Sequence, residues 1–135
     1  MEVYKKSNIE EKKDLVPSGS TIPSSDLTVG LYFRYEKNNR TILLQYDENG
    51  NWNPIRSFGE MTIYVSPLGT DDLEFGDGLG INAYQSITYA VSQIPQSIYG
   101  DCNVIIEGGN YTENVFVDGK LPVGDFKVKF TGLKR

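Results

Sequence analysis

Strand-like runs of apolar and polar residues in the first half of the chain predict a small β-sheet. The runs cover residues 31–36 and 40–46 and a third segment around Trp52. Alternation with a period of two turns one face of each strand toward a core. Residues 37–39 are expected to form the first hairpin turn, because Asn tolerates a positive φ. The pattern therefore predicts a three-stranded meander, with Trp52 packed over one of its faces.

A second pattern, further along the chain, predicts one more strand and one amphipathic helix. Residues 61–65 alternate and are rich in β-branched residues, which favours a strand, and a loop follows over residues 66–80. Asn82 is the expected N-cap and Gln85 follows three residues later, as in a capping box. Pro95 is expected to end the helix. The buried stripe at helical spacing consists of Ala83, Ile87, Ala90, Val91 and Ile94.

Three short strand-like runs follow the helix, at residues 103–107, 114–117 and 126–131. Turns rich in Gly, Asn and Asp separate them. A spacing of about a dozen residues fits the rungs of a solenoid. The same spacing also fits an antiparallel meander, so both arrangements remain open at this point.

These patterns divide the chain into three segments. Residues 1–27 are polar and are expected to form a flexible N-terminal arm and linker. Residues 28–60 form the small β-meander, which is expected to act as an anchoring module. Residues 61–135 form a strand, loop, helix and strand module. The predicted fold class is mainly β with one amphipathic helix.

Composition excludes several classes of chemistry. The chain has no histidine and a single cysteine, Cys102, so it lacks the residues for an intramolecular disulfide, a His-based triad or a typical zinc site. Cys102 lies in an apolar run and is expected to be buried. We predict neither a metal nor a cofactor. No apolar run approaches the ~20 residues that span a bilayer, so we predict no membrane partner.

The charge distribution argues against nucleic acid as a partner. The net charge is −5, and residues 61–135 carry five basic and nine acidic groups. No Lys or Arg occurs between Arg56 and Lys120. A surface with this balance repels phosphate groups.

Three sets of residues are candidates for chemistry. The acidic loop at residues 70–78 lacks the alternate Asp pattern of an EF-hand and is expected to be solvated. Paired carboxylates can cleave glycosidic bonds, but we expect the three carboxylates near the predicted rung ends to be ordinary edge residues and predict no catalytic residue. The candidate acids are Glu107, Glu113 and Asp118. The candidate glycan-contacting aromatic residues are Tyr32, Tyr35, Tyr46 and Trp52.

Two blocks of the sequence resemble bacteriophage tail proteins. Residues 30–55, GLYFRYEKNNRTILLQYDENGNWNPI, look like a module of tail fibres. Residues 64–115 resemble the opening of tailspike and appendage β-helices of the pectin-lyase-like, right-handed type. The residues that carry this second resemblance are Tyr64, Val65, Pro67, Gly69, Asp71, Ile87, Ala90, Val91, Ile94, Pro95, Val104, Ile106, Gly109, Tyr111, Glu113 and Val115.

The resemblance implies a structural, non-enzymatic component of a phage tail or host-adsorption apparatus. Such a protein is made in the host cytoplasm and located in the virion, with other tail proteins and possible host surface polysaccharide as partners. A fragment of a longer appendage would be a homotrimer, and a complete chain a monomer. Two alternatives remain: a glycan-binding module for host cell-wall polysaccharide, and the N-terminal stub of a polysaccharide depolymerase.

Overall fold

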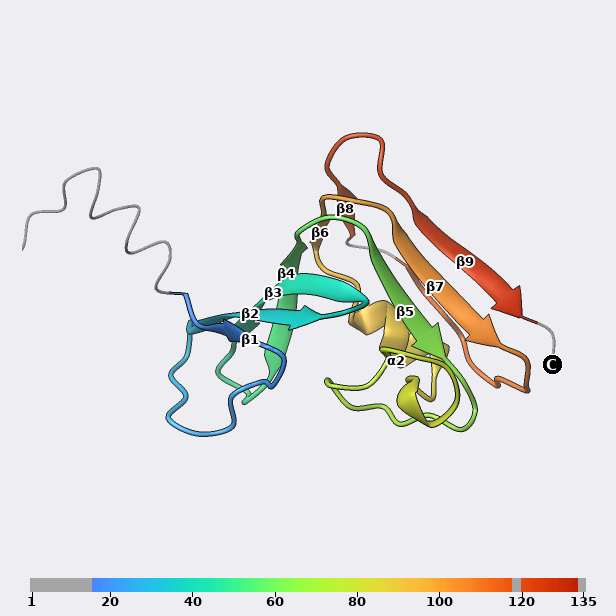
Figure 1. Ribbon diagram of the computed structural model, residues 1–135, viewed down its shortest axis with the longest axis horizontal. Coiled ribbons are helices and arrows are strands. Elements are labelled where there is room, and N and C mark those ends of the chain that lie inside the picture. The colour runs from blue at the N-terminus through green and yellow to red at the C-terminus, as the bar shows by residue number, and fades with distance from the viewer. Residues whose placement is uncertain (1–15, 118–119, 134–135) are drawn as a thin grey trace, which may run out of the picture.

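The computed structural model describes residues 16–117 and 120–133 of the chain. Of these residues, 37% lie in strands and 8% in helices, so the predicted mainly-β fold with a single α-helix is confirmed. The strands form a six-stranded sheet in the order β1-β2-β3-β4-β6-β8 and a three-stranded sheet in the order β5-β7-β9 (Figure 1). The elements are β1 (Ser18–Gly19), β2 (Tyr32–Lys37), β3 (Arg40–Tyr46), β4 (Trp52–Ser57), β5 (Met61–Val65), η1 (Gly80–Asn82), α2 (Ile87–Ser92), β6 (Ser97–Ile98), β7 (Cys102–Glu107), β8 (Leu121–Pro122) and β9 (Val128–Leu133).

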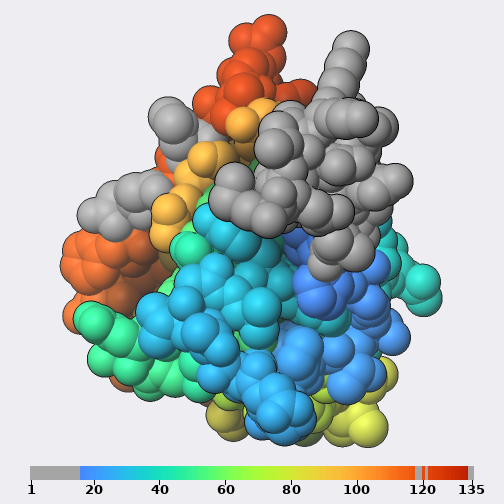
Figure 2. Space-filling view, turned by 90° about the vertical axis from the view of Figure 1, so that its left-hand side faces the viewer, coloured from blue at the N-terminus to red at the C-terminus, as the bar shows by residue number. Residues whose placement is uncertain are grey.

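The predicted meander is present as the antiparallel strands β2, β3 and β4. Trp52 is buried, and its ring centroid lies 6.2 Å from that of Phe33 and 5.2 Å from that of Tyr46, as the predicted packing requires. Seen from the side of this sheet, residues of its first strands and their connections make up much of the surface (Figure 2). The side chains that the three strands turn into the core are those of Phe33, Tyr35, Ile42, Leu44 and Trp52.

The first hairpin turn forms for a different reason from the one expected. Lys37 pairs directly with Arg40, so the turn consists of Asn38 and Asn39 alone. Neither has a positive φ, because Asp26 is the only non-glycine residue with one among the described residues. Asn39 instead fixes the turn through its side chain, whose Nδ2 donates to the carbonyl oxygens of Thr62 and Gly76 at 2.8 and 3.1 Å.

The later strands are parallel, which settles the alternative that the sequence left open. Strands β5, β7 and β9 pair in parallel, and β4, β6 and β8 do the same. The chain therefore makes three passes, each with a strand in the larger sheet, a corner and a strand in the smaller sheet. Figure 1 shows β5, β7 and β9 side by side and pointing the same way. We call these three passes the parallel stack.

Glycine occupies the corners because the passes approach closely there. Phe58-Gly59-Glu60 forms the corner between β4 and β5, and Tyr99-Gly100-Asp101 forms the equivalent corner between β6 and β7. A Cβ added to Gly100 would lie 2.2 Å from the carbonyl carbon of Gly59. That distance is impossible without moving backbone, so the second corner requires glycine.

The helix begins later than predicted. It covers Ile87–Ser92, and its N-cap is Ser86, whose Oγ accepts a hydrogen bond from the backbone N–H of Tyr89 at 3.1 Å. The expected N-cap, Asn82, ends the 3₁₀ turn η1 instead. The chain cannot be helical from Asn82 because Tyr84 is extended and pairs with Val65 of β5.

Part of the predicted helical stripe therefore lies outside the helix. Ala90 and Val91 are buried within it, as expected, and Ile94 is buried just beyond its end. Ala83 is buried in the extended segment before it, and Ile87 is only half-buried.

Other predictions fare unevenly. Cys102 is fully buried, as expected, and burial raises the pKa of its thiol to about 12.

Residues 114–117 form no strand, so that prediction was wrong. Residues 1–15 of the predicted arm and Asp118 lie outside the described residues, whereas Ser18–Gly19 pairs with β2 in place of the expected linker. The six-stranded sheet also crosses the expected boundary at residue 60. None of the helices in the described ranges is long and apolar enough to cross a membrane.

The corner geometry predicts that Gly100→Ala lowers the free energy of unfolding by at least about 2 kcal/mol, because the added methyl group overpacks against backbone. Gly132→Ala is the matched control, since a Cβ at Gly132 of β9 meets nothing within 4 Å. Urea unfolding of both variants measures the difference. Equal stabilities of the two variants would contradict the close approach of the first two corners.

Candidate functional site

One edge of the parallel stack is sealed by hydrogen bonds. The outward backbone groups of β5 are paired: the N–H of Thr62 donates to the Asn39 carbonyl at 2.9 Å and the N–H of Tyr64 to the Gly76 carbonyl at 3.1 Å. The Tyr64 carbonyl accepts from the N–H of Tyr84 at 2.9 Å. An unpaired edge strand is a template for pairing with other chains, and here the hairpin tip and the following loop occupy it.

The buried Arg40 holds these sealing segments together. Its side chain starts on β3, and Nη2 donates to the carbonyl oxygens of Leu73 and Phe75 and to the hydroxyl of Tyr84, each at 3.0 Å. Its guanidinium carbon lies 5.3 Å from the ring centroid of Tyr35 and 5.6 Å from that of Tyr84. One cation therefore fixes two segments to the first sheet: the loop at residues 73–75 and the extended segment that contains Tyr84.

The surroundings of Arg40 leave several polar atoms unsatisfied. Nε and Nη1 of Arg40 and the hydroxyl of Tyr35 are buried without a hydrogen-bond partner among the described residues. Burial raises the pKa of Tyr84 to about 12, although the nearby Arg40 charge acts in the opposite direction. Burial raises the pKa of Tyr35 as well, so both tyrosines stay neutral at physiological pH. Tyr35 contacts Arg40 through its ring, and Tyr84 through its ring and its hydroxyl. Neither tyrosine acts as a counterion.

The opposite edge of the parallel stack is open. Strand β9 pairs only with β7 among the described strands. The Cys102 N–H donates to the Lys127 carbonyl, so by alternation the N–H groups of Val128, Phe130 and Gly132 point away from β7. Those groups present a free parallel edge.

The open edge is also apolar. Ile63, Val104 and Phe130 stand in register on the three strands, and the first two are completely buried, whereas Phe130 is 44% exposed. The position that is interior in the first two passes is therefore uncovered in the third. More apolar side chains are exposed in the last pass and the segment that leads into it: Val115, Phe116, Val117, Val123, Phe126 and Leu133. We call β9 and these residues the open end.

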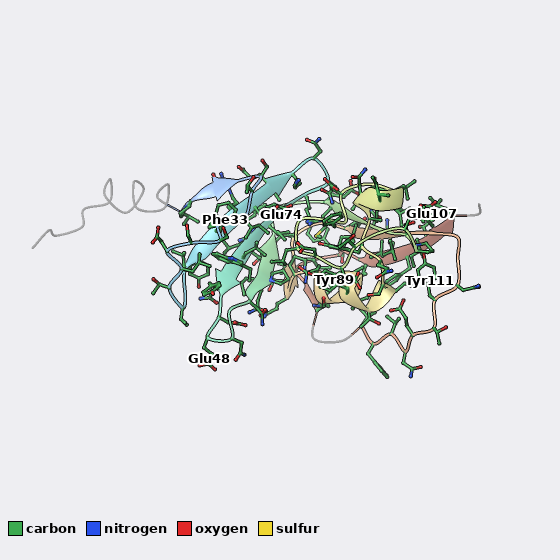
Figure 3. The ribbon with its side chains drawn as sticks, turned by 90° about the horizontal axis from the view of Figure 1, so that it is seen from below. Phe33, Glu48, Glu74, Tyr89, Glu107 and Tyr111 are labelled. Carbon is green, nitrogen blue, oxygen red and sulfur yellow. The ribbon has the colours of Figure 1, made fainter. Side chains whose placement is uncertain are left out.

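The two candidate acids within the described residues, Glu107 and Glu113, have structural partners instead of a shared cleft. Glu107 accepts a hydrogen bond from the N–H of Gly80 at 3.1 Å, and its side chain lies far from Phe33, near Tyr111 (Figure 3). Glu113 accepts from the N–H groups of Ile87 and Thr88 at 3.0 and 2.7 Å and from the Thr88 hydroxyl at 2.6 Å. These bonds attach the segment after β7 to the start of helix α2.

The hydrogen bonds set the ionisation of Glu113. Partial burial raises the pKa of its carboxyl, but the bonds from Thr88 and Ile87 outweigh that effect and hold it below the usual 4.5. A general acid needs the opposite shift. Glu113 is therefore a helix-capping carboxylate at neutral pH.

The acidic loop is used in the same structural way. Asp71 accepts hydrogen bonds from the N–H groups of Gln85 and Ser86, Glu74 accepts from the N–H of Ile22, and Asp77 pairs with Lys37 at 3.6 Å. Among the described residues, no three His, Cys, Asp or Glu side chains lie close enough together to hold a metal ion.

The structure does not bring the four candidate glycan-contacting aromatic residues to one exposed surface. Tyr35 is 1% exposed and Trp52 is 6% exposed, so a ligand reaches neither ring face. Tyr46 is half-buried against Trp52, and only Tyr32 is well exposed. Contact with glycan through these residues stays a prediction, and the structure leaves it mainly to Tyr32.

Sequence reasoning missed the two features that define the site. Arg40 lies at the start of the predicted strand at residues 40–46, and nothing in its local sequence indicates that it is buried. The two-residue strands β6 and β8 were missed because they are too short to show a period. The repeat of aromatic residue, glycine and acid at 58–60 and 99–101 was the signal that could have revealed the stack.

Comparisons with known proteins assign the chain to no family. No protein family, no curated protein and no solved structure matches this chain.

Arg40→Met is predicted to lower the free energy of unfolding by about 3 kcal/mol, because three acceptors lose a charged donor at once. Arg34→Met is the matched control on the exposed face of the same sheet, where the loss should stay below about 1 kcal/mol. Urea unfolding measures both values. If Arg40→Met were as stable as the wild type, the apolar side chain would replace the cation, and Arg40 would not be what fastens the loop.

Glu113→Gln is predicted to lower stability by about 1 kcal/mol at pH 7, since the helix start loses a charged acceptor. Because the folded pKa is below the unfolded value of 4.5, the carboxylate stabilises the fold above that pH and loses this effect as the pH falls through the folded pKa. The difference between wild type and variant should therefore vanish in acid. Thermal unfolding between pH 3 and pH 7 tests this, with Glu48→Gln, on the exposed turn after β3 (Figure 3), as the unaffected control. A pH-independent difference would contradict the capping role.

Proposed function

We propose that this chain is a structural, non-enzymatic component of a bacteriophage tail or host-adsorption apparatus, located in the virion. In this proposal the first sheet attaches the chain to neighbouring tail proteins. The parallel stack is the opening of a right-handed β-helix that leads toward the host surface. The resemblance of residues 30–55 and 64–115 to tail fibres and tailspikes motivates the proposal.

The observation that carries it is the difference between the two edges of the parallel stack. The β5 edge is closed by Arg40, Asn39 and Tyr84, whereas the β9 edge is apolar and pairs with no further strand of the described part of the chain. A stack that is closed at one edge and open at the other can grow in one direction only. That polarity suits a protein that roots an elongated appendage.

The state of the carboxylates supports a non-enzymatic role. Glu107 and Glu113 each accept hydrogen bonds from backbone N–H groups, and the lowered pKa of Glu113 keeps it ionised. Glu113 is therefore not prepared to donate a proton to a leaving group.

The proposal predicts that this chain is present in phage particles from its source. Particles purified by density gradient are immunoblotted with an antibody raised against the 135-residue chain, and immunogold labelling locates the signal. We expect a band in the particle fraction and labelling at the tail. A chain found only in the lysate of infected cells, or labelling of the capsid alone, would contradict the proposal.

A further inference from the structure

A row of residues crosses the outward face of the six-stranded sheet and carries two arginines. Arg34 pairs with Leu43, Leu43 with Arg56, and Arg56 with Ser97. Phe33 and Tyr35 turn into the core, so Arg34 between them turns away from it. Both arginines thus belong to the solvent face of the sheet.

Two aromatic rings hold the Arg56 guanidinium in place. Its central carbon lies 3.8 Å from the ring centroid of Tyr99 and 4.5 Å from that of Phe58. These rings come from the two equivalent corners of the parallel stack, and they are 37% and 42% exposed. Stacking between two rings limits the rotamers of Arg56, so the entropy lost on binding a ligand is small.

The charge of Arg56 is not neutralised by the described residues. Its Nε donates to the carbonyl oxygen of its neighbour Ser57 at 3.2 Å, and neither terminal nitrogen forms a hydrogen bond within residues 16–117 and 120–133. No carboxylate among the described residues forms an ion pair with Arg56. The side chain therefore presents an ordered guanidinium with free donors to solvent.

Arg34 adds a second cation beside the first. Its guanidinium carbon lies 5.9 Å from the Phe58 ring centroid, and its Nε pairs with Glu36 at 3.4 Å. Phe58 is thus flanked by both arginines. We call Arg34, Arg56, Phe58 and Tyr99 the guanidinium face.

We propose that the guanidinium face binds the carboxylate or phosphate groups of an anionic polysaccharide. A planar guanidinium with free N–H groups matches both oxyanions in a bidentate manner. The site is an open sheet face flanked by exposed rings, which fits an extended polymer with an apolar side to each unit. Two cations on a chain of net charge −5 are too few for nucleic acid, which is bound through many phosphate contacts. The proposal stands independently of a phage origin.

The test is titration calorimetry of the 135-residue chain with three polymers at low salt: polygalacturonate, poly(glycerol phosphate) and neutral dextran. We expect one or both anionic polymers to bind, more weakly as NaCl rises, and dextran not to bind. The stronger of the two anionic polymers identifies carboxylate or phosphate as the preferred group.

Variants locate the site. Arg56→Gln should weaken binding about tenfold or more, and Arg56→Lys should weaken it clearly, because a lysine keeps the charge but not the planar fork. Lys37→Gln is the matched control, since it removes the same charge from the opposite face of β2 and should change affinity less than twofold. Tyr99→Leu, which keeps both arginines, should produce an intermediate loss.

Several outcomes would overturn the proposal. One is the absence of binding to both anionic polymers, and another is an equal loss for Lys37→Gln and Arg56→Gln, which would mean non-specific attraction. Tighter binding of poly-glutamate or single-stranded RNA would assign the guanidinium face to an acidic peptide or a nucleic acid instead. Thermal unfolding checks each variant, and if Arg56→Gln does not fold, Tyr99→Leu and Arg34→Gln decide the matter.

Discussion

The fold depends on one buried cation. Arg40 is 3% exposed, and its Nη2 joins two loop carbonyls and the Tyr84 hydroxyl to the first sheet. A buried guanidinium without such partners would be strongly unfavourable, so the loop must close over it as it is withdrawn from water. Closing the loop brings Gly76 and Tyr84 to the edge of β5. The same contact therefore fixes where the parallel stack begins and prevents another strand from pairing there.

From that edge onward, the same parallel pairing repeats from one strand of the stack to the next. Each pass sets a strand in register on the one before it, and the glycine corners keep the distance between passes short. The interior row of Ile63, Val104 and Phe130 passes from complete burial to partial exposure within three strands. Among the described residues, the stack is thus sealed at its β5 edge and exposes apolar side chains at its β9 edge. The corner rings also build the guanidinium face, so the repeat has both a structural and a surface consequence.

The sequence was informative where a residue pattern reports directly on burial. Alternation located the meander and β5, and an apolar run located β7 and the buried Cys102.

The sequence was misleading where a distant contact overrides the local preference of a segment. Tyr84 pairs with β5, so the helix begins only at Ile87, after its N-cap Ser86. Residues 114–117 form no strand, and Glu113 before them accepts hydrogen bonds from the start of that helix. Arg40 looks like a solvated charge in the sequence, because its burial depends on a loop more than thirty residues away. The spacing of the later strands fits parallel and antiparallel pairing equally well. Their direction therefore follows only from which residues pair in the structure.

Amide hydrogen exchange by NMR, on a dilute solution of the chain, tests most directly whether one edge is sealed and the other open. The account predicts strong protection of the Thr62 and Tyr64 N–H groups, which are bonded to Asn39 and Gly76. It predicts fast exchange of the Phe130 and Gly132 N–H groups, which point away from β7. Protection of Phe130 equal to that of Thr62, or fast exchange at Thr62 in the folded chain, would contradict it.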